Sequence, residues 1–260
     1  MAPVVIAHRG ASAHEPENTP AAYRLALDAG ADGWECDVRL SADQHLVLVH
    51  DRTVSRTTGA VGNVSQMNLA DLQTLDWGSW RRRPGDPPSE DRHSVLTLPE
   101  FLELAIDAGR PLELLIETKH PTRHGAKVER RLVEVLDRFG LRSGGHQHLT
   151  IRVMSFSYIA MQRMRTYAPG VRLVQLVERL TPVVSGGSLP PGVDTLGPDI
   201  ALLRRDPGIV ADQHARGHEV YVWTVDDPAD VQRCLDLGVD GIITNRPAEV
   251  LEQVRVAGSV

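Results

Sequence analysis

Short runs of β-branched and other apolar residues alternate with helical patterns along the whole chain. Such alternation predicts βα units and a mainly parallel sheet. The predicted strands cover residues 4–8, 33–39, 45–50, 112–118, 149–155, 171–177, 193–200, 219–224 and 241–244. Because single α/β barrels commonly have about 250 residues, we expect a TIM-type (β/α)8 barrel, although this gives one strand candidate more than such a barrel has places.

Two similar segments support a barrel assembled from related units. Thr19 followed by Pro20 is typical of a helix start, and Gly30 is typical of a helix end. The segments 26–37 and 234–245 then share one order of features, namely a helix end, a glycine, an Asp-Gly pair and a strand. A repeated αβ unit is the pattern that a barrel of similar modules would leave in a sequence.

The region after the second predicted strand departs from a regular barrel. Too few residues separate 33–39 from 45–50 for the crossover that parallel strands need. We therefore expect a hairpin here, which accounts for the ninth candidate.

The long, weakly periodic stretch that follows predicts a helical insertion at about 52–96, after the third strand, and 98–108 as the returning barrel helix. The chain is expected to form a single domain over residues 1–260.

Composition narrows the class of protein. Hydrophobic residues make up 42% and charged residues 24% of the chain, which is typical of a soluble globular domain. A net charge of −6 disfavours nucleic acid as a partner, while a small anionic substrate can still bind in a pocket that holds a few cations. The two cysteines are too few for a disulfide framework, no apolar run is long enough for a transmembrane segment, and no signal peptide is evident. We expect a cytoplasmic protein, and the sequence leaves its oligomeric state open.

Polar residues interrupt four of the apolar strands at their ends. Side chains two residues apart share one face of a strand, so Glu35 lies on the face of Asp37, and Glu117 on that of Lys119. His8 ends the first predicted strand and His50 ends the third. Active sites of α/β barrels lie at the carboxyl ends of the strands. We therefore expect these six side chains to converge at one mouth of the barrel.

Three carboxylates and two imidazoles suggest metal-assisted acid–base chemistry. Clustering Glu35, Asp37 and Glu117 is costly unless a cation binds them, and oxygen ligands favour one divalent ion such as Mg²⁺ or Ca²⁺. His8 and His50 suit a general acid and a general base. The ordinary alternatives are structural histidines, a solvated carboxylate pair on the second strand, and a simple ion pair of Glu117 with its neighbouring lysine.

Lysine usage singles out Lys119. The chain holds 28 Lys and Arg residues, and only Lys119 and Lys127 are lysines. Lys127 lies in an exposed helical pattern, whereas Lys119 lies in a barrel strand, where a compact ammonium differs from a planar guanidinium. This usage predicts a specific role for Lys119, and chance is the alternative.

A series of short motifs runs through nearly the whole chain. The motifs are His8-Arg9-Gly10, Glu17-Asn18-Thr19, Glu35-Cys36-Asp37-Val38, His50-Asp51, Arg56-Thr57-Thr58-Gly59, Ile116-Glu117-Thr118-Lys119, Val222-Trp223-Thr224 and Asp240-Gly241-Ile242-Ile243-Thr244-Asn245-Arg246-Pro247. In this order, they resemble the motifs of the glycerophosphodiester phosphodiesterases. The family has a barrel fold with an insertion after the strand that ends at His50. Gln44 departs from the pattern, because the family often has glycine in this tight turn.

The resemblance implies a phosphoric diester hydrolase and assigns the site residues. Its catalytic pair would be His8 and His50. The metal ligands would be Glu35, Asp37 and Glu117. Arg9 and Lys119 would hold the phosphate, and Trp223 would line the pocket for the glycerol or the alcohol group.

The implied reaction is hydrolysis of a glycerophosphodiester to sn-glycerol 3-phosphate and an alcohol. Related enzymes are thought to form a cyclic phosphate, which water then opens. Three alternatives stay open: a lysophospholipase D on the same scaffold, a non-catalytic phosphoester-binding barrel and, with less support, a metal-dependent aldolase-type barrel. The sequence does not indicate the alcohol group or the physiological metal.

Overall fold

A computed structural model describes residues 2–81, 94–146, 148–179 and 188–258. Eight parallel strands form a closed barrel, because β1 pairs with both β10 and β2. These strands are β1 (Val4–His8), β2 (Gly33–Leu40), β4 (Leu112–Thr118), β6 (Leu149–Ser155), β7 (Arg172–Val177), β8 (Thr195–Pro198), β9 (Glu219–Val222) and β10 (Gly241–Thr244). The predicted TIM-type barrel is confirmed.

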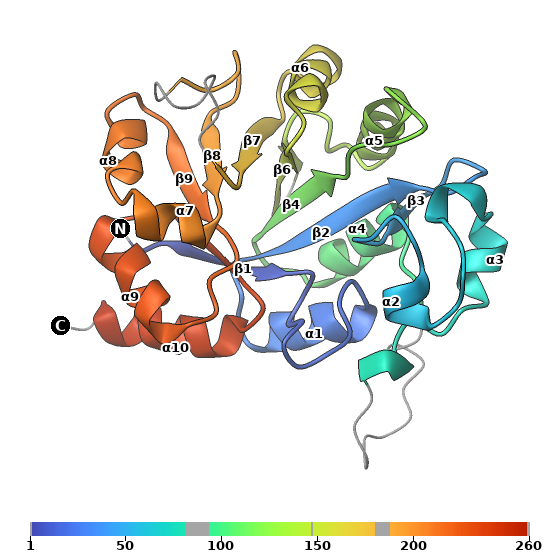
Figure 1. Ribbon diagram of the computed structural model, residues 1–260, viewed down its shortest axis with the longest axis horizontal. Coiled ribbons are helices and arrows are strands. Elements are labelled where there is room, and N and C mark those ends of the chain that lie inside the picture. The colour runs from blue at the N-terminus through green and yellow to red at the C-terminus, as the bar shows by residue number, and fades with distance from the viewer. Residues whose placement is uncertain (1, 82–93, 147, 180–187, 259–260) are drawn as a thin grey trace.

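Helices surround the barrel in Figure 1. They are α1 (Pro20–Asp28), α4 (Leu98–Asp107), α5 (Lys127–Arg138), α6 (Tyr158–Tyr167), α7 (Ile200–Arg205), α8 (Ile209–His214), α9 (Pro228–Leu237) and α10 (Pro247–Ala257). The side chain of Thr19 caps α1, and Gly238 ends α9 in the left-handed conformation. The predicted helix at 98–108 is α4. None of the described helices is both long and apolar enough to cross a membrane.

Two short strands lie outside the barrel. β3 (Leu46–Leu48) pairs antiparallel with β2, which confirms the predicted hairpin. This strand is shorter than the predicted 45–50, so His50 follows it rather than ending it. β5 (Gly145–His146) is a short antiparallel partner of β6 that the sequence pattern did not predict.

The segment after β3 forms the predicted insertion from very short helices. Its described part contains α2 (Ser55–Thr58), η1 (Val64–Gln66), α3 (Leu69–Gln73) and η2 (Ser79–Arg81). A small core of its own includes Val54, Leu72 and Trp77. Part of the predicted range, 82–93, lies outside the described residues, and the assignment of 1–260 to one domain stays a prediction.

Packing on the outer face of β2 orients the polar residues on its inner face, at the mouth of the barrel. Trp34 points outward and packs against Tyr23 of α1 and Phe101 of α4, with ring centroids 5.3 and 5.9 Å away. All three rings are fully buried, and burial of large aromatic side chains contributes strongly to stability. Because neighbouring side chains of a strand alternate, this packing holds Glu35 and Asp37 on the inner face.

Gln44 occupies a strained position in the turn between β2 and β3. Its φ of 67° lies in the left-handed region, which costs a non-glycine residue about 1–2 kcal/mol. Glycine adopts this region freely but loses about 0.5–1 kcal/mol through greater flexibility of the unfolded chain. We therefore expect Gln44→Gly to raise the free energy of unfolding by about 0.5–1 kcal/mol, measured in urea. A lower free energy of unfolding would contradict the assigned strain.

Candidate active site

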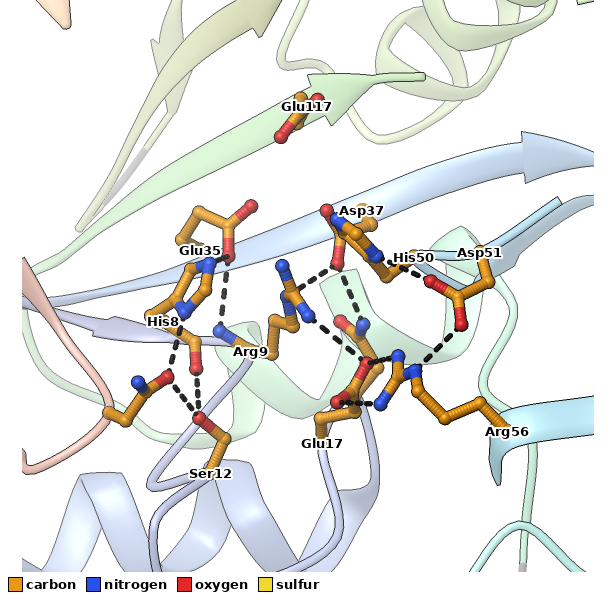
Figure 2. Close-up of polar contacts among 12 residues, drawn as sticks. His8, Arg9, Ser12, Glu17, Glu35, Asp37, His50, Asp51, Arg56 and Glu117 are labelled. Carbon is orange, nitrogen blue, oxygen red and sulfur yellow. Dashed lines mark hydrogen bonds and ion pairs between the residues drawn. The ribbon is translucent and has the colours of Figure 1, made fainter. Parts of the chain in front are cut away.

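Three buried carboxylates meet at the mouth of the barrel. Each of Glu35, Asp37 and Glu117 offers an oxygen, and these oxygens lie within 4.8 Å of one another. The register of the sheet explains the cluster, because Asp37 of β2 lies directly beside Glu117 of β4. Figure 2 shows the three side chains on two neighbouring strands. The clustering expected from strand alternation is present.

The electrostatics of the cluster fit a divalent cation. Burial, together with the charge of Asp37, raises the pKa of Glu35 well above its usual range, and burial raises the pKa of Glu117 to about 7. Burial would also raise the pKa of Asp37, but Arg9 and Lys119 outweigh it and hold that pKa well below its usual range. The Oε1 atom of Glu35 is buried and has no hydrogen-bond partner among the described residues. Oxygen ligands of this kind suit Mg²⁺ or Ca²⁺.

Two cations contact the carboxylate cluster from different sides. The Lys119 ammonium lies 2.7 Å from Glu117 and 2.9 Å from Asp37. The Arg9 guanidinium lies 2.9 Å from Asp37 and 3.2 Å from Glu17. The ion pair of Glu117 with Lys119, which the sequence left as an alternative, is therefore present. This ion pair is compatible with a contact of Lys119 to a bound phosphate.

The tautomer of His8 follows from its partners. The Asn245 Nδ2 donates to the Asp226 carboxylate at 2.6 Å, so the Asn245 Oδ1 faces His8. His8 Nδ1 lies 2.7 Å from this oxygen and must therefore donate its proton. The Nε2 atom then carries a lone pair, and it lies 3.9 Å from the Glu35 carboxylate. Burial lowers the pKa of His8 to about 3, which keeps this ring neutral at neutral pH.

His50 is oriented by a chain of charged side chains. Its Nδ1 lies 2.7 Å from Asp51, which accepts the proton and leaves Nε2 as the nitrogen available for exchange. Arg56 of α2 contacts Asp51 and donates two hydrogen bonds to Glu17, at 2.8 and 2.7 Å. Glu17 in turn contacts Arg9. Figure 2 shows this chain, which links the insertion to both sides of the carboxylate cluster.

The two histidines approach the cluster along one edge of β2. β4 covers the other edge, while β1 pairs only with residues 33–35 and β3 with residues 38–40. His8 ends β1 beside Glu35, and His50 follows β3, which runs in the opposite direction. The two rings therefore lie at either end of the Glu35–Asp37 segment. Antiparallel pairing, rather than the carboxyl end of a barrel strand, brings His50 to the mouth.

Most of the predicted site residues line one open pocket of about 490 Å³. Of the eight predicted site residues, those that line it are His8, Arg9, Glu35, His50, Glu117, Lys119 and Trp223. Asp37, the eighth, lies in the carboxylate cluster below. Trp223 donates its Nε1–H to Gly197 at 2.7 Å and packs edge-on against Phe156. All eight residues are thus brought together.

Sequence reasoning gave no roles to several residues that shape the site. The supporting residues are Glu17, Asn18, Asp51, Arg56, Phe156, Asp226 and Asn245. Some of them stand in the quoted motifs, and this was the only signal available. Their partners lie up to 237 positions away in the chain, so no local pattern identifies these pairs.

Comparisons with known proteins identify the family of the chain. Residues 8–249 match the model of the glycerophosphoryl diester phosphodiesterase family. A probable glycerophosphodiester phosphodiesterase 1 of Mycobacterium tuberculosis is 41% identical over 261 residues, which cover 99% of this chain and 95% of that protein. A glycerophosphodiester phosphodiesterase of Caldanaerobacter subterraneus subsp. tengcongensis is 31% identical, with 99% and 100% covered.

A solved structure shares the fold over nearly its full length. It is an Oleispira antarctica phosphodiesterase in complex with its product, sn-glycerol-3-phosphate. The two chains superpose with a TM-score of 0.83 at 27% identity, covering 98% of this chain and 97% of the other. The chain therefore belongs to the glycerophosphoryl diester phosphodiesterase family and is a phosphoric diester hydrolase.

Proposed function

We propose that the chain hydrolyses glycerophosphodiesters to sn-glycerol 3-phosphate and an alcohol, with the help of a divalent cation. The observation that carries this proposal is the placement of His8 and His50 at either end of a buried carboxylate cluster, within one pocket. The product complex of the Oleispira antarctica relative supports the same product here. A cytoplasmic location, expected from the sequence, stays a prediction.

Glu35, Asp37 and Glu117 would hold the cation. When bound, a divalent ion supplies charge stabilisation at the phosphoryl oxygens and acts as a Lewis acid. The protein adds fixed positive charge through Arg9 and Lys119, both of which contact the cluster. Preorganised charge of this kind stabilises the charge that develops in the transition state.

His8 and His50 would move the protons. Each ring donates its Nδ1 proton to a fixed acceptor, which leaves Nε2 for the substrate. A neutral Nε2 on one side can take a proton from the attacking hydroxyl, and the ring on the other side, when it is protonated at both nitrogens, can donate its Nε2 proton to the leaving oxygen. Asp51 stabilises a protonated His50, because its carboxylate lies 2.7 Å from Nδ1.

The role of Lys119 can be separated from that of a simple cation. Its ammonium fits between two carboxylates at 2.7 and 2.9 Å in a buried position. The wider, planar guanidinium of arginine cannot place a point charge there. We expect Lys119→Arg to lower turnover by about 10²-fold or more, as for loss of an electrostatic transition-state contact.

Lys127→Arg provides the matched control, because Lys127 is exposed at the start of α5. Steady-state turnover of a glycerophosphodiester at saturating cation is the measurement, and a thermal melt checks folding. If Lys119→Arg turns over as fast as Lys127→Arg, Lys119 is a structural partner of Glu117, and the scarcity of lysine was chance.

A release assay for glycerol 3-phosphate tests the proposed function. The purified chain is incubated with choline, ethanolamine, inositol and lysolipid diesters, with Mg²⁺ and with Ca²⁺. Release from the short diesters supports the proposal. Release from the lysolipid diesters alone would favour the lysophospholipase D alternative. Binding without release of product from any diester would indicate a non-catalytic barrel.

A further inference from the structure

A second, cationic pocket adjoins the active-site pocket. It has a volume of about 600 Å³, opens to solvent and shares the side chain of Lys119 with the active-site pocket. The walls come from the carboxyl end of β2, from Arg52 between β3 and α2, from η1 and from the segment between β4 and α5. In Figure 1 these elements lie on the side of the barrel that carries β3 and the insertion.

The charge of this pocket has one sign. Its charged lining residues are Arg39, Arg52, Lys119 and Arg123, and no carboxylate is among the described residues that line it. The chain as a whole has a net charge of −6, so the cluster opposes the overall charge of the molecule. Cations gathered in a concave surface attract anions more strongly than isolated surface charges do.

Two of these cations are available to a ligand. Lys119 contacts Glu117 and Asp37 and is assigned to the phosphate of the diester. Arg39 donates two hydrogen bonds to the backbone oxygen of His50, at 2.9 and 2.7 Å. Arg52 and Arg123 are exposed, and no ion pair joins either of them to a carboxylate in the part of the chain that the structure describes.

The second pocket lies where one end of a diester bound at the carboxylate cluster would reach. Arg39 follows Asp37 by two residues on β2, and Lys119 follows Glu117 by two residues just after β4. Because side chains two residues apart share one face of a strand, both cations lie on the same face as the carboxylates and farther toward the outside of the barrel mouth. The active-site pocket itself is lined by apolar side chains, among them Trp223 and Phe156, and by Glu178, and neither Arg52 nor Arg123 is among its lining residues. A diester held at the cluster would thus have an apolar wall on one side and the arginines on the other.

We propose that this second pocket binds an anionic group on the alcohol part of the diester, a phosphate or a carboxylate, through Arg52 and Arg123. The inference rests on the proposed function and specifies its preferred substrates. Because the glycerol part of the diester carries no charge, it would lie against the apolar side chains around Trp223, so that the alcohol part would extend past Lys119 toward the two arginines. Diesters whose alcohol carries a second negative charge are therefore the better substrates.

Two matched substrate pairs test this preference. Glycerophosphoserine differs from glycerophosphoethanolamine by a carboxylate, and a glycerophosphoglycerol that carries a terminal phosphate differs from glycerophosphoglycerol by that phosphate. The measured quantity is the ratio of kcat/KM within each pair. We expect both ratios to exceed one at low salt and to fall as ionic strength rises, because exposed charges are screened. The pair with the larger ratio identifies which anion fits.

The double variant Arg52→Gln/Arg123→Gln removes the two available charges without changing a buried side chain. We expect the ratio of kcat/KM within each substrate pair to fall by about tenfold in this variant, as for loss of one or two charge-assisted contacts. Arg216→Gln is the control, because the exposed Arg216 precedes the amino end of β9, at the opposite end of the barrel, and should keep the wild-type ratio. A thermal melt verifies folding of both variants.

The outcomes separate this inference from the function on which it rests. If all four diesters release glycerol 3-phosphate with ratios near one, or if the double variant keeps the wild-type ratios, the anion pocket is wrong and the proposed function stands. If none of the four diesters releases glycerol 3-phosphate, the proposed function fails and the anion pocket with it.

Discussion

Replacing His8 or His50 by alanine is expected to lower turnover by about 10²–10⁴-fold, the usual contribution of a positioned general acid or base. Each ring has its Nδ1 fixed by an acceptor, Asn245 for His8 and Asp51 for His50, so Nε2 is held toward the pocket. Neither side chain belongs to the apolar core. Stability should therefore change little, and steady-state turnover together with a thermal melt measures the two effects separately.

His214→Ala is the matched control for both histidine variants. His214 is exposed and pairs with Asp240 just before β10, at the end of the barrel opposite the active site. The control should keep wild-type turnover. If either His8→Ala or His50→Ala turns over nearly as fast as this control, the replaced histidine is not part of the acid–base pair.

Removal of divalent cations is expected to lower turnover by a similar factor. Lewis-acid stabilisation contributes several kcal/mol to phosphoryl chemistry, and each 1.36 kcal/mol corresponds to tenfold in rate, so a chelator should reduce turnover by about 10²–10⁴-fold. Restored Mg²⁺ or Ca²⁺ should recover it. Unchanged turnover after exhaustive chelation would exclude a catalytic cation at Glu35, Asp37 and Glu117.

Thermal stability provides a readout of the same site that does not depend on activity. A cation at about 100 times its Kd should raise the free energy of unfolding by about 2.7 kcal/mol. Glu35→Gln should abolish this increase, because the amide is a poorer ligand for a hard cation. The variant should still fold, since burial raises the pKa of Glu35 and the neutral amide resembles the protonated carboxyl.

Glu252→Gln is the control for the stability measurement. Glu252 is exposed on α10 and pairs with Arg255 one turn away, so the cation should stabilise this variant as much as the wild type. Equal stabilisation of Glu35→Gln would instead place any cation elsewhere on the molecule.

Local patterns were sufficient to predict the barrel and the inner face of its strands. The period of two in β2 placed Glu35 and Asp37 on one side and Cys36 on the other, and the structure has the cysteine in the outer core. Thr19 and Pro20 at its start and Gly30 after its end predicted α1. These features depend on a few consecutive residues, which is why the sequence alone was enough to predict them.

The contacts that orient the two proposed catalytic histidines were decided by the tertiary structure. His8 meets an asparagine 237 positions away, and Arg56 meets Glu17 across 39 positions. Such pairs form only after the barrel has closed and the insertion has packed on it, so neither periodicity nor capping indicates them. The same holds for the cations of the second pocket, which come from three separate segments.

By itself, the sequence determined the parallel barrel and the face of each polar strand residue, and it predicted eight site residues that the structure brings together. It placed His50 correctly at the mouth but by the wrong route, as the end residue of the third strand. The structure shows that β3 runs antiparallel beside the carboxyl end of β2, so that the chain after β3 brings His50 back toward Asp37. The short spacing between these two runs was enough to predict the hairpin, whereas the residue at which β3 ends and the side chains that His50 then meets depend on pairing that a local pattern of apolar residues does not specify.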